Sequence, residues 1–325
     1  MKQFILPAIL ISEIIFFTWI GDYTFKSPED FLRYFQSYSA DLLTQSAPVL
    51  LAAFGMTLIL ATAGIDLSIA SMIALISCVM SSFDGDVSFW WKAVPLGLLV
   101  ALVLGLTNGS LIAVLDVPPI IATLGTMILF RGLCFTVMGD LEKSPFFDVP
   151  GYEWFGRFPG ALLLISLVYL GLGAGYHYSR KKRELLMIGG NPIAARYAGI
   201  PVDRRLIQVY VFSGFMAFLS AVCFTARNSS VSGSSLTGME LQVIAAVILG
   251  GTRVQGGYSS LSGTFFGVFI IAVLDEGLRG AAGWGEENLP FKLSYLQYVL
   301  IGIILIGGVW MNTHLPFPKK NAKSS

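Results

Sequence analysis

Thr62-Ala63-Gly64-Ile65-Asp66-Leu67-Ser68 lies in a stretch, 48–83, that is otherwise apolar enough to cross a lipid bilayer twice. An acidic side chain at the middle of a membrane helix costs roughly 2.5–3.5 kcal/mol on insertion scales. Membrane proteins that keep such a group bury it within the protein or place it on a wet path. Gly64 and the serines after Asp66 indicate a helix break, which lipid tolerates only beside protein or a cavity. The stretch therefore predicts a membrane protein that moves a solute.

The composition supports a membrane location. Of the 325 residues, 55% are hydrophobic and 13% are charged, whereas a soluble domain has about 25% charged residues. Segments 94–115 and 206–226 reach the roughly 20 apolar residues that a bilayer core requires, which argues against a soluble helical protein. The formal net charge of +1 gives no basic surface of the kind that binds nucleic acid. The 35 glycines are typical of helices that pack closely or break in lipid.

Apolar runs separated by charges, Gly or Pro predict an all-α polytopic membrane protein with about ten transmembrane helices, some of them broken or short. The crossings are expected near 3–20, 45–64, 66–83, 93–115, 119–138, 160–178, 206–226, 239–251, 257–278 and 293–311. The run 239–251 is too short for a full crossing and is expected to end inside protein. Segments 21–44 and 139–159 are expected to form short surface elements. Because no linker divides the chain, 1–325 is expected to be a single integral domain.

The distribution of basic residues predicts the orientation. The loop 179–205 is the most basic connection, with Arg180, Lys181, Lys182, Arg183, Arg196, Arg204 and Arg205. Cytoplasmic loops of membrane proteins are enriched in Lys and Arg. This loop is therefore expected to face the cytoplasm, together with both chain termini and the lysines of the tail beyond residue 314.

The motifs of catalysis and metal binding are missing from the sequence. There is no GxxxxGK[ST] phosphate loop, HExxH, GxSxG or dinucleotide fingerprint. Cys78, Cys134 and Cys223 lie in apolar runs without CxxC spacing, which predicts packing residues and not a disulfide framework or a zinc site. The chain is expected to be no enzyme, to ligate no metal and to hold no cofactor of its own.

Two classes of transport protein remain. An ion-coupled secondary transporter normally has several ionisable groups deep in its spans. Only Asp66 is expected to be deep, and the other candidates are expected near span ends: Glu13, Arg131, Arg227, Glu240, Asp275 and Glu276. The second class is the membrane subunit of a machine that is powered by a separate ATPase.

The loop 188–200 distinguishes these classes. Asn191 is a good N-cap, Pro192 suits the first helical position, and Gly199 provides a stop. The segment predicts a compact helix outside the membrane, with an alanine-rich face that fits a groove in a partner. The alternative is an ordinary loop helix that bridges two spans.

Three segments resemble one family when taken together: Gly55–Ser68, Ile188–Ile200 and Glu240–Gly257. They resemble, in order and at similar spacing, the ribose-type (monosaccharide) permease subunits of bacterial ABC importers, within the branched-chain amino acid/sugar permease superfamily. The resemblance covers nearly the whole chain. It implies a type II-like ABC importer permease in the cell inner membrane that acts as a homodimer, with the solute path between the two copies. Its partners would be an ABC ATPase, which binds ATP and Mg, and a periplasmic sugar-binding protein.

The resemblance also assigns roles to individual residues. In the family, the segment after the glycine pair docks into the ATPase, and that coupling role would pass to Gly190, Asn191, Ala194, Ala195, Arg196, Ala198 and Gly199. The family often has Gly-Gly-Ile-Asp-Leu-Ser-Val-Gly-Ser around the acid. This chain has alanine at two of those glycines, Ala63 and Ala70, so we expect the same break with less freedom.

Polar residues within the spans are candidates for the translocation path: Asp66, Ser68, Ser71, Asn108, Thr123, Thr126 and Glu240. Each has a structural alternative. Asp66 is also suited to capping the next helix by accepting from the N–H groups near Ser68 and Ile69, and the two roles are compatible. Asn108 and the two threonines also suit interhelical hydrogen bonds of roughly 0.6–2 kcal/mol. Glu240 also suits the start of a helix near the outer surface.

The function expected from these observations is import of a monosaccharide delivered by the binding protein. The alternatives are an ion-coupled secondary transporter, the same ABC architecture carrying a nucleoside, a furanosyl signal or a branched-chain amino acid, and a membrane scaffold without transport.

Overall fold

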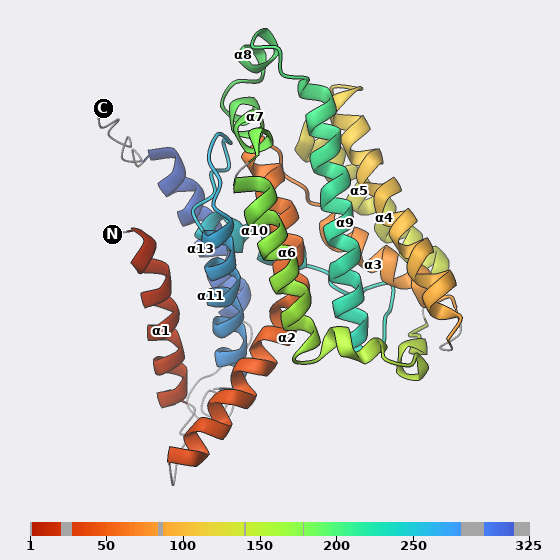
Figure 1. The fold of residues 1–325 in the computed structure, drawn as a ribbon, viewed down its shortest axis with the longest axis vertical. Coiled ribbons are helices and arrows are strands. Elements are labelled where there is room, and N and C mark those ends of the chain that lie inside the picture. The colour runs from red at the N-terminus through yellow and green to blue at the C-terminus, as the bar shows by residue number, and fades with distance from the viewer. Residues whose placement is uncertain are drawn as a thin grey trace.

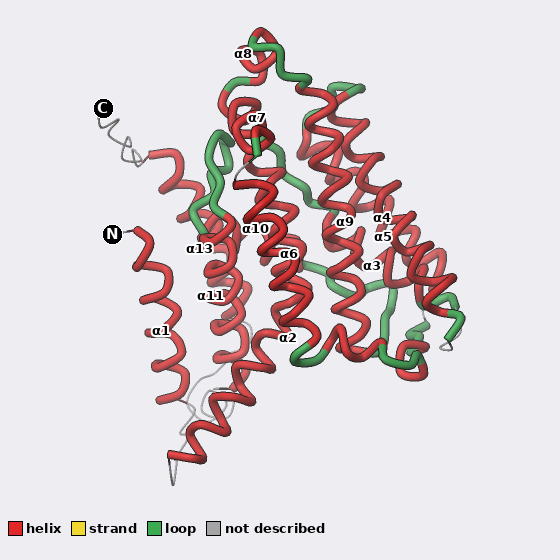
Figure 2. The backbone as a smooth tube through the Cα atoms, in the orientation of Figure 1, coloured by secondary structure: helices red, strands yellow, loops and turns green. Residues whose placement is uncertain are grey.

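The computed structural model describes residues 2–20, 28–83, 87–139, 141–177, 179–280 and 296–314. Within these residues every regular element is helical, and the only β-pairing is an isolated bridge between Lys143 and Val231 (Figure 2). The helices are α1 Lys2–Ile20, α2 Pro28–Ala61, α3 Ile69–Met80, α4 Phe89–Ala113, α5 Pro119–Met138, η1 Pro145–Asp148, η2 Tyr152–Gly156, α6 Gly160–His177, α7 Arg180–Gly190, α8 Pro192–Tyr197, α9 Val202–Asn228, α10 Met239–Leu249, α11 Leu261–Gly280 and α13 Leu296–His314.

The long helices confirm an all-α polytopic membrane protein. The described residues contain five helices long and apolar enough to cross a bilayer, or six if α6 and α7 count as one bent span. Shorter apolar helices occur at Ile5–Phe16, Ile69–Met80, Met239–Leu249 and Leu296–Trp310. The predicted number of about ten crossings stays a prediction. The tail beyond residue 314 lies outside the described residues.

Two predicted boundaries are wrong. The crossing expected at 66–83 is the 12-residue helix α3, which at 1.5 Å per residue is about 18 Å long and shorter than a bilayer core. The segment 28–44, expected to be short surface elements, is the first half of the 34-residue helix α2. Figure 1 shows that α2 changes direction along its length, and Pro48 provides a cause because it cannot donate to the helix ladder. Segment 139–159 does form short elements, η1 and η2.

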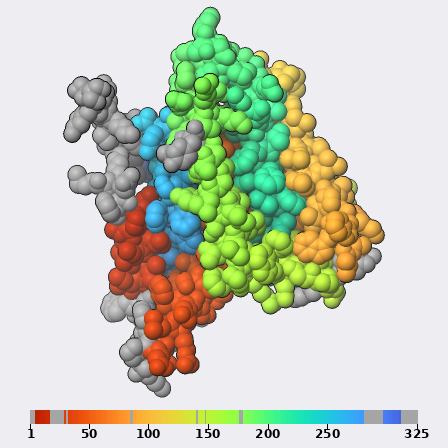
Figure 3. All heavy atoms as spheres, viewed as in Figure 1, coloured from red at the N-terminus to blue at the C-terminus, as the bar shows by residue number. Residues whose placement is uncertain are grey.

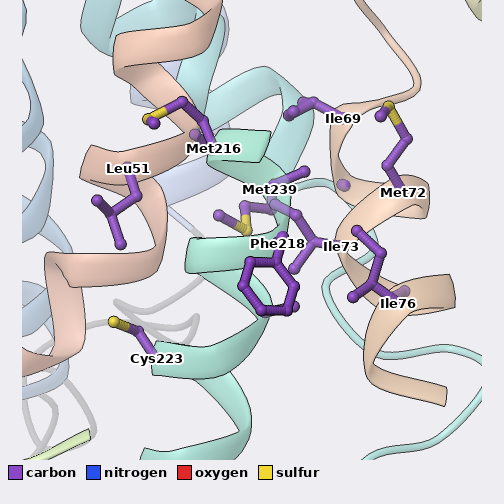
Figure 4. Packing of buried hydrophobic residues seen from close by; sticks show 14 of the residues in the cluster. Leu51, Ile69, Met72, Ile73, Ile76, Met216, Phe218, Cys223 and Met239 are labelled. Carbon is purple, nitrogen blue, oxygen red and sulfur yellow. The ribbon is translucent and has the colours of Figure 1, made fainter. Parts of the chain in front are cut away.

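The core lies where α2, α3, α9 and α10 meet. Figure 4 shows Leu51, Ile73, Met216 and Met239 of these helices in one cluster, and each is at most 5% exposed. In α3 all residues except Val79 are buried, as expected for a helix that is apolar all round and enclosed by protein. In α10, which the sequence predicted to end inside protein, residues 243–248 are buried, whereas Leu241 near its start is exposed.

Small residues and cysteines fill this interior as predicted. A Cβ on Gly214 of α9 would lie 2.3 Å from the carbonyl oxygen of Ala101 in α4, so only glycine permits this approach of the two helices. Cys78, Cys134 and Cys223 are all buried and free. They act as packing residues.

The break between α2 and α3 is centred on an unexpected residue. Ala63 adopts a left-handed conformation with φ of 62°, and the following Gly64 does not. Gly64 is required for space, because a Cβ there would lie 2.8 Å from the Tyr210 hydroxyl oxygen and 3.0 Å from Ile59. Two hydrogen bonds close the end of α2. The Ala63 N–H donates to the Leu60 carbonyl at 3.0 Å, and the Gly64 N–H donates to the Ile59 carbonyl at 3.1 Å.

The left-handed Ala63 generates a test. An L-residue with a Cβ in this conformation costs roughly 1–2 kcal/mol, so Ala63→Gly is expected to raise the free energy of unfolding by about 1 kcal/mol. The matched control is Ala70→Gly, which places glycine inside α3 and is expected to lower stability by about 0.5–1 kcal/mol. Thermal unfolding in detergent measures both variants. Equal destabilisation by the two substitutions would contradict this account of the break.

Candidate functional site

Asp66 is completely buried in the break between α2 and α3. Its Oδ1 accepts hydrogen bonds from the Ser68 N–H at 2.9 Å and from the Ser68 hydroxyl at 2.6 Å. Because Ser68 immediately precedes α3, the carboxylate lies at the positive end of that helix, where a negative charge is stabilised. Of the predicted contacts, the hydrogen bond from the Ser68 N–H is present, but Ser68 is itself the N-cap of α3 and no side-chain cap bond to that helix is found among the described residues.

A buried network extends from Asp66 to α4. The Asn108 side-chain amide donates to the Ser68 hydroxyl at 2.8 Å, so Ser68 links the acid to the amide. Asp66 Oδ2, Asn108 Oδ1 and the Tyr210 hydroxyl are buried and have no hydrogen-bond partner among the described residues. Since buried polar atoms normally have partners, the break has capacity for one more polar group.

The other predicted path residues occupy different places. Thr123 also serves the break, because its hydroxyl lies 3.0 Å from the Ile65 carbonyl oxygen and 2.8 Å from that of Pro119. Ser71 and Thr126 are buried on α3 and α5, and the Thr126 hydroxyl donates within α5 to the Thr123 carbonyl at 3.3 Å. Glu240 is separate and half-buried in the first turn of α10. Six of the seven residues are thus at most 7% exposed, inside the protein.

Two charged residues do not lie at the ends of their helices. Glu13 and Arg131 were expected near span ends, and they lie within α1 and α5. Arg131 donates through Nη1 to the carbonyls of Gly233 and Ser235 at 2.9 and 2.7 Å. It therefore fixes the connection between α9 and α10.

The seven predicted coupling residues lie together at one tip of the molecule (Figures 1 and 3). They run from the end of α7 through α8 to the turn that follows it: Gly190, Asn191, Ala194, Ala195, Arg196, Ala198 and Gly199. Asn191 caps α8 by accepting from the Ala194 N–H at 2.9 Å, and Pro192 opens the helix. Gly199 ends it with φ of 78°. The compact helix predicted from this loop is confirmed.

One buried contact and one ion pair orient α8. Ala195 is 1% exposed and belongs to the same buried cluster as Ile188 and Val202. The Arg196 guanidinium binds the Asp203 carboxylate through both terminal nitrogens, and the Nη1–Oδ2 distance is 2.7 Å. This carboxylate raises the pKa of Arg196 above its ordinary value. Arg196 therefore holds α8 against the first turn of α9.

The outer face of α8 contains two residues that the sequence analysis missed. Ile193 and Tyr197 are 67% and 89% exposed, and residues four apart lie on the same face of a helix. With the exposed Ala194 and Ala198 they form the tip surface, defined by these four residues. Exposed apolar side chains gathered at a projection mark an interaction site. The spacing of four residues between Ile193 and Tyr197, within a segment predicted to be helical, is the sequence pattern that indicates this shared face.

Below the tip, three distant parts of the chain meet at what we call the glycine junction: Ala61–Ala63, Gly189 and Gly256–Gly257. The Gly257 N–H donates to the Ala61 carbonyl at 3.1 Å. A Cβ on Gly189 would lie 2.0 Å from the same oxygen, and a Cβ on Gly256 would lie 2.8 Å from the Gly189 Cα. The end of α2 is therefore in contact with the loop before α11 and with the end of α7.

The described residues line two cavities. The smaller, about 290 Å³, is beside the junction and is lined by Gly64, Asp116, Ile188, Pro192 and Tyr210 among others. The larger, about 600 Å³, is lined by α2, α9, α10, α11 and α13. It includes Leu241 and Gln242, the neighbours of Glu240.

Comparison with known proteins identifies the class. Residues 38–309 match the family described as branched-chain amino acid transport system / permease component. This match covers most of the chain, which therefore belongs to that family. The chain is a multi-pass membrane component of a transport system and not an enzyme.

Individual relatives cover most of the chain. It is 32% identical over 273 residues to the ribose import permease protein of Escherichia coli strain K12, with 82% of each chain covered. It is 34% identical over 277 residues to the ribose import permease protein of Bacillus subtilis strain 168, with 84% of this chain and 83% of that protein covered. Over an alignment of 381 residues, it is 28% identical to the xylose transport system permease protein of Escherichia coli strain K12, with 96% of this chain and 92% of that protein covered. No solved structure matches the chain.

The network at the break generates a test. Ser68→Ala removes the hydroxyl that donates to Asp66 and accepts from Asn108, so the free energy of unfolding is expected to fall by about 1–3 kcal/mol. The control is Thr107→Ala, because within the described part of the chain the Thr107 hydroxyl bonds only to the Val103 carbonyl of its own helix. Thermal unfolding in detergent compares the two. An unchanged midpoint for Ser68→Ala would show that the network contributes nothing to stability.

Proposed function

We propose that the chain is the pore-forming permease subunit of an ABC importer for a monosaccharide. The observation that carries the proposal is the projecting tip of α8, which is joined by backbone contacts to the break beside Asp66. An ATP-driven machine needs such a surface, where a separate motor docks, and a link from it to the spans. Relatives that are named as ribose and xylose permeases favour a monosaccharide as the solute.

The proposal includes partners that complete the machine. A separate ABC ATPase would bind ATP and Mg, and a periplasmic sugar-binding protein would deliver the solute. A second copy of the chain would form the other half of the path. The tip then faces the cytoplasm of a bacterial cell, as do both chain termini, and Figure 1 shows α1 ending and α2 beginning away from the tip.

We assign the predicted coupling residues to two tasks. The tip surface, with Ile193 and Tyr197 as its apolar anchors, would contact the ATPase. Asn191, Ala195, Arg196 and Gly199 would shape and orient α8, through the cap, the buried contact, the ion pair and the terminal turn described above.

The glycine junction would transmit movement of α8 to α2 and toward α11. A push on α8 reaches Gly189 at the end of α7, and Gly189 lies directly against the Ala61 carbonyl, where α2 ends. The Gly257 N–H on the same oxygen carries the displacement toward α11. Closely packed backbone moves as a rigid body, so both segments would shift together.

The polar residues buried in the spans support the path from inside each protomer. Asp66, Ser68, Asn108 and Thr123 bond to one another or to the break. We propose that they hold the shape of the break and that its three unpartnered oxygens take a polar partner during gating.

The function is tested by reconstitution. Proteoliposomes with the chain, the ABC ATPase of the same genome and the matching binding protein are expected to accumulate D-ribose, D-xylose or L-arabinose only with ATP. The chain alone is expected to accumulate none under a sodium or pH gradient. Uphill uptake by the chain alone would identify a secondary transporter and overturn the proposal.

The junction is tested by Gly189→Ala. The added methyl group would meet the Ala61 carbonyl oxygen at 2.0 Å, so uptake is expected to fall by roughly tenfold or more while the ATPase still co-purifies, because the rigid transmission is displaced. The matched control is Gly171→Ala on α6, where an added Cβ meets nothing within 4 Å. Normal uptake by Gly189→Ala, or an equal loss in both variants, would exclude this transmission.

A further inference from the structure

We propose that the 600 Å³ cavity between α2, α9, α10, α11 and α13 binds the monosaccharide in each copy of the chain, before the solute enters the path between the two copies; this inference rests on the proposed function. Its volume falls within the roughly 300–1,000 Å³ of small-molecule sites. It is separate from the network around Asp66, because none of the six buried path residues lines it.

The cavity lies in the half of the molecule away from the tip. Its walls include the end of α9 at Arg227, the start of α10 at Gln242, the second half of α11 at Asp275 and the first half of α13 at Tyr298. Since α9 runs away from the tip (Figure 1), these positions gather toward the opposite end. That end would receive solute from the binding protein.

The lining has the chemistry of a site for a neutral polyol. Gln45 and Gln242 are half-buried, and within the described residues no hydrogen bond of their amides is found. An amide both donates and accepts, which suits hydroxyl groups that do the same. Ser46, Asn228 and Thr237 add further polar groups to the lining, and apolar side chains from α2, α10, α11 and α13 form much of the remaining wall. Placed polar groups in a largely apolar wall are typical of small-molecule sites.

Two of the three charged residues in the lining neutralise each other. Arg279 binds Asp275 through two hydrogen bonds of 3.1 and 2.9 Å. Arg227 donates through Nη1 to the neutral Thr44 hydroxyl at 2.6 Å and keeps its charge. Among the described residues, the lining therefore presents one uncompensated cation, whereas several charge-assisted donors would suit the phosphate of a phospholipid headgroup, and this favours an uncharged ligand.

Gly302 offers a way to fill the cavity without disturbing the fold. It lines the cavity on α13, and a Cβ added there meets nothing within 4 Å. Gly307 lies on the same helix, has equally free space and is not part of the lining. Gly302→Phe and Gly307→Phe therefore form a matched pair in which only the first places a ring in the cavity.

The experiment measures ATP-dependent uptake of labelled D-ribose, D-xylose and L-arabinose by proteoliposomes of the whole importer. Gly302→Phe is expected to lower uptake by about tenfold or more, because it removes volume from a site of limited size. Gly307→Phe is expected to transport normally, and basal ATP hydrolysis is expected to stay unchanged in both variants.

A second pair removes chemistry instead of volume. Gln242→Ala is expected to lower uptake several-fold with intact ATP hydrolysis, whereas Gln36→Ala on the exposed start of α2 changes nothing. If the Gly302→Phe variant fails to assemble, the comparison of Gln242→Ala with Gln36→Ala tests by itself whether the cavity binds the monosaccharide.

The outcomes separate the two proposals. If the unaltered importer moves no monosaccharide, the proposed function fails. If it transports normally and both Gly302→Phe and Gln242→Ala match their controls, the cavity is a lipid or solvent pocket and this inference fails alone.

Discussion

Backbone polar groups within a bilayer must find partners inside the protein, and the break between α2 and α3 depends on this constraint. Two of its carbonyl groups bind distant parts of the chain, since the Ala61 carbonyl accepts from Gly257 and the Ile65 carbonyl from Thr123. The Ser68 N–H donates within the break, to Asp66. The break is therefore a point where α2, α5 and the loop before α11 are tied together. A helix as short as α3 is tolerated beside it because protein encloses almost all of its residues.

The same requirement joins the break to the projecting tip. Gly189 ends the basic helix α7 and lies against the carbonyl that Gly257 already uses. The tip, the glycine junction and the break thus form one continuous packed unit. Because close packing leaves little free space, a displacement of the tip is transmitted to the break. The large cavity belongs to the other half of the molecule, among α2, α9, α10, α11 and α13. The regions proposed for the motor and for the solute are spatially separate.

Several parts of the fold were predictable because they depend on neighbours in the sequence. The apolar run at 119–138 coincides with α5, and the Asn191 cap and Gly199 stop delimit α8. Predictions failed where packing outweighs local signals. The segment 28–44, for which short surface elements were predicted, forms the first half of α2. Ala63 takes a left-handed conformation in which glycine would be less strained, whereas Gly64 is required for space beside Tyr210 and Ile59.

The sequence by itself determined the class of protein, the all-helical membrane fold and the compact helix at the tip, because hydrophobic run length and capping act over a few residues. It also identified Asp66 as a residue needing special surroundings. Only the tertiary structure decided which polar groups meet it: Ser68 from the break and, through Ser68, Asn108 from α4. The glycine junction and the large cavity likewise depend on contacts between residues far apart in the chain, which no local pattern encodes.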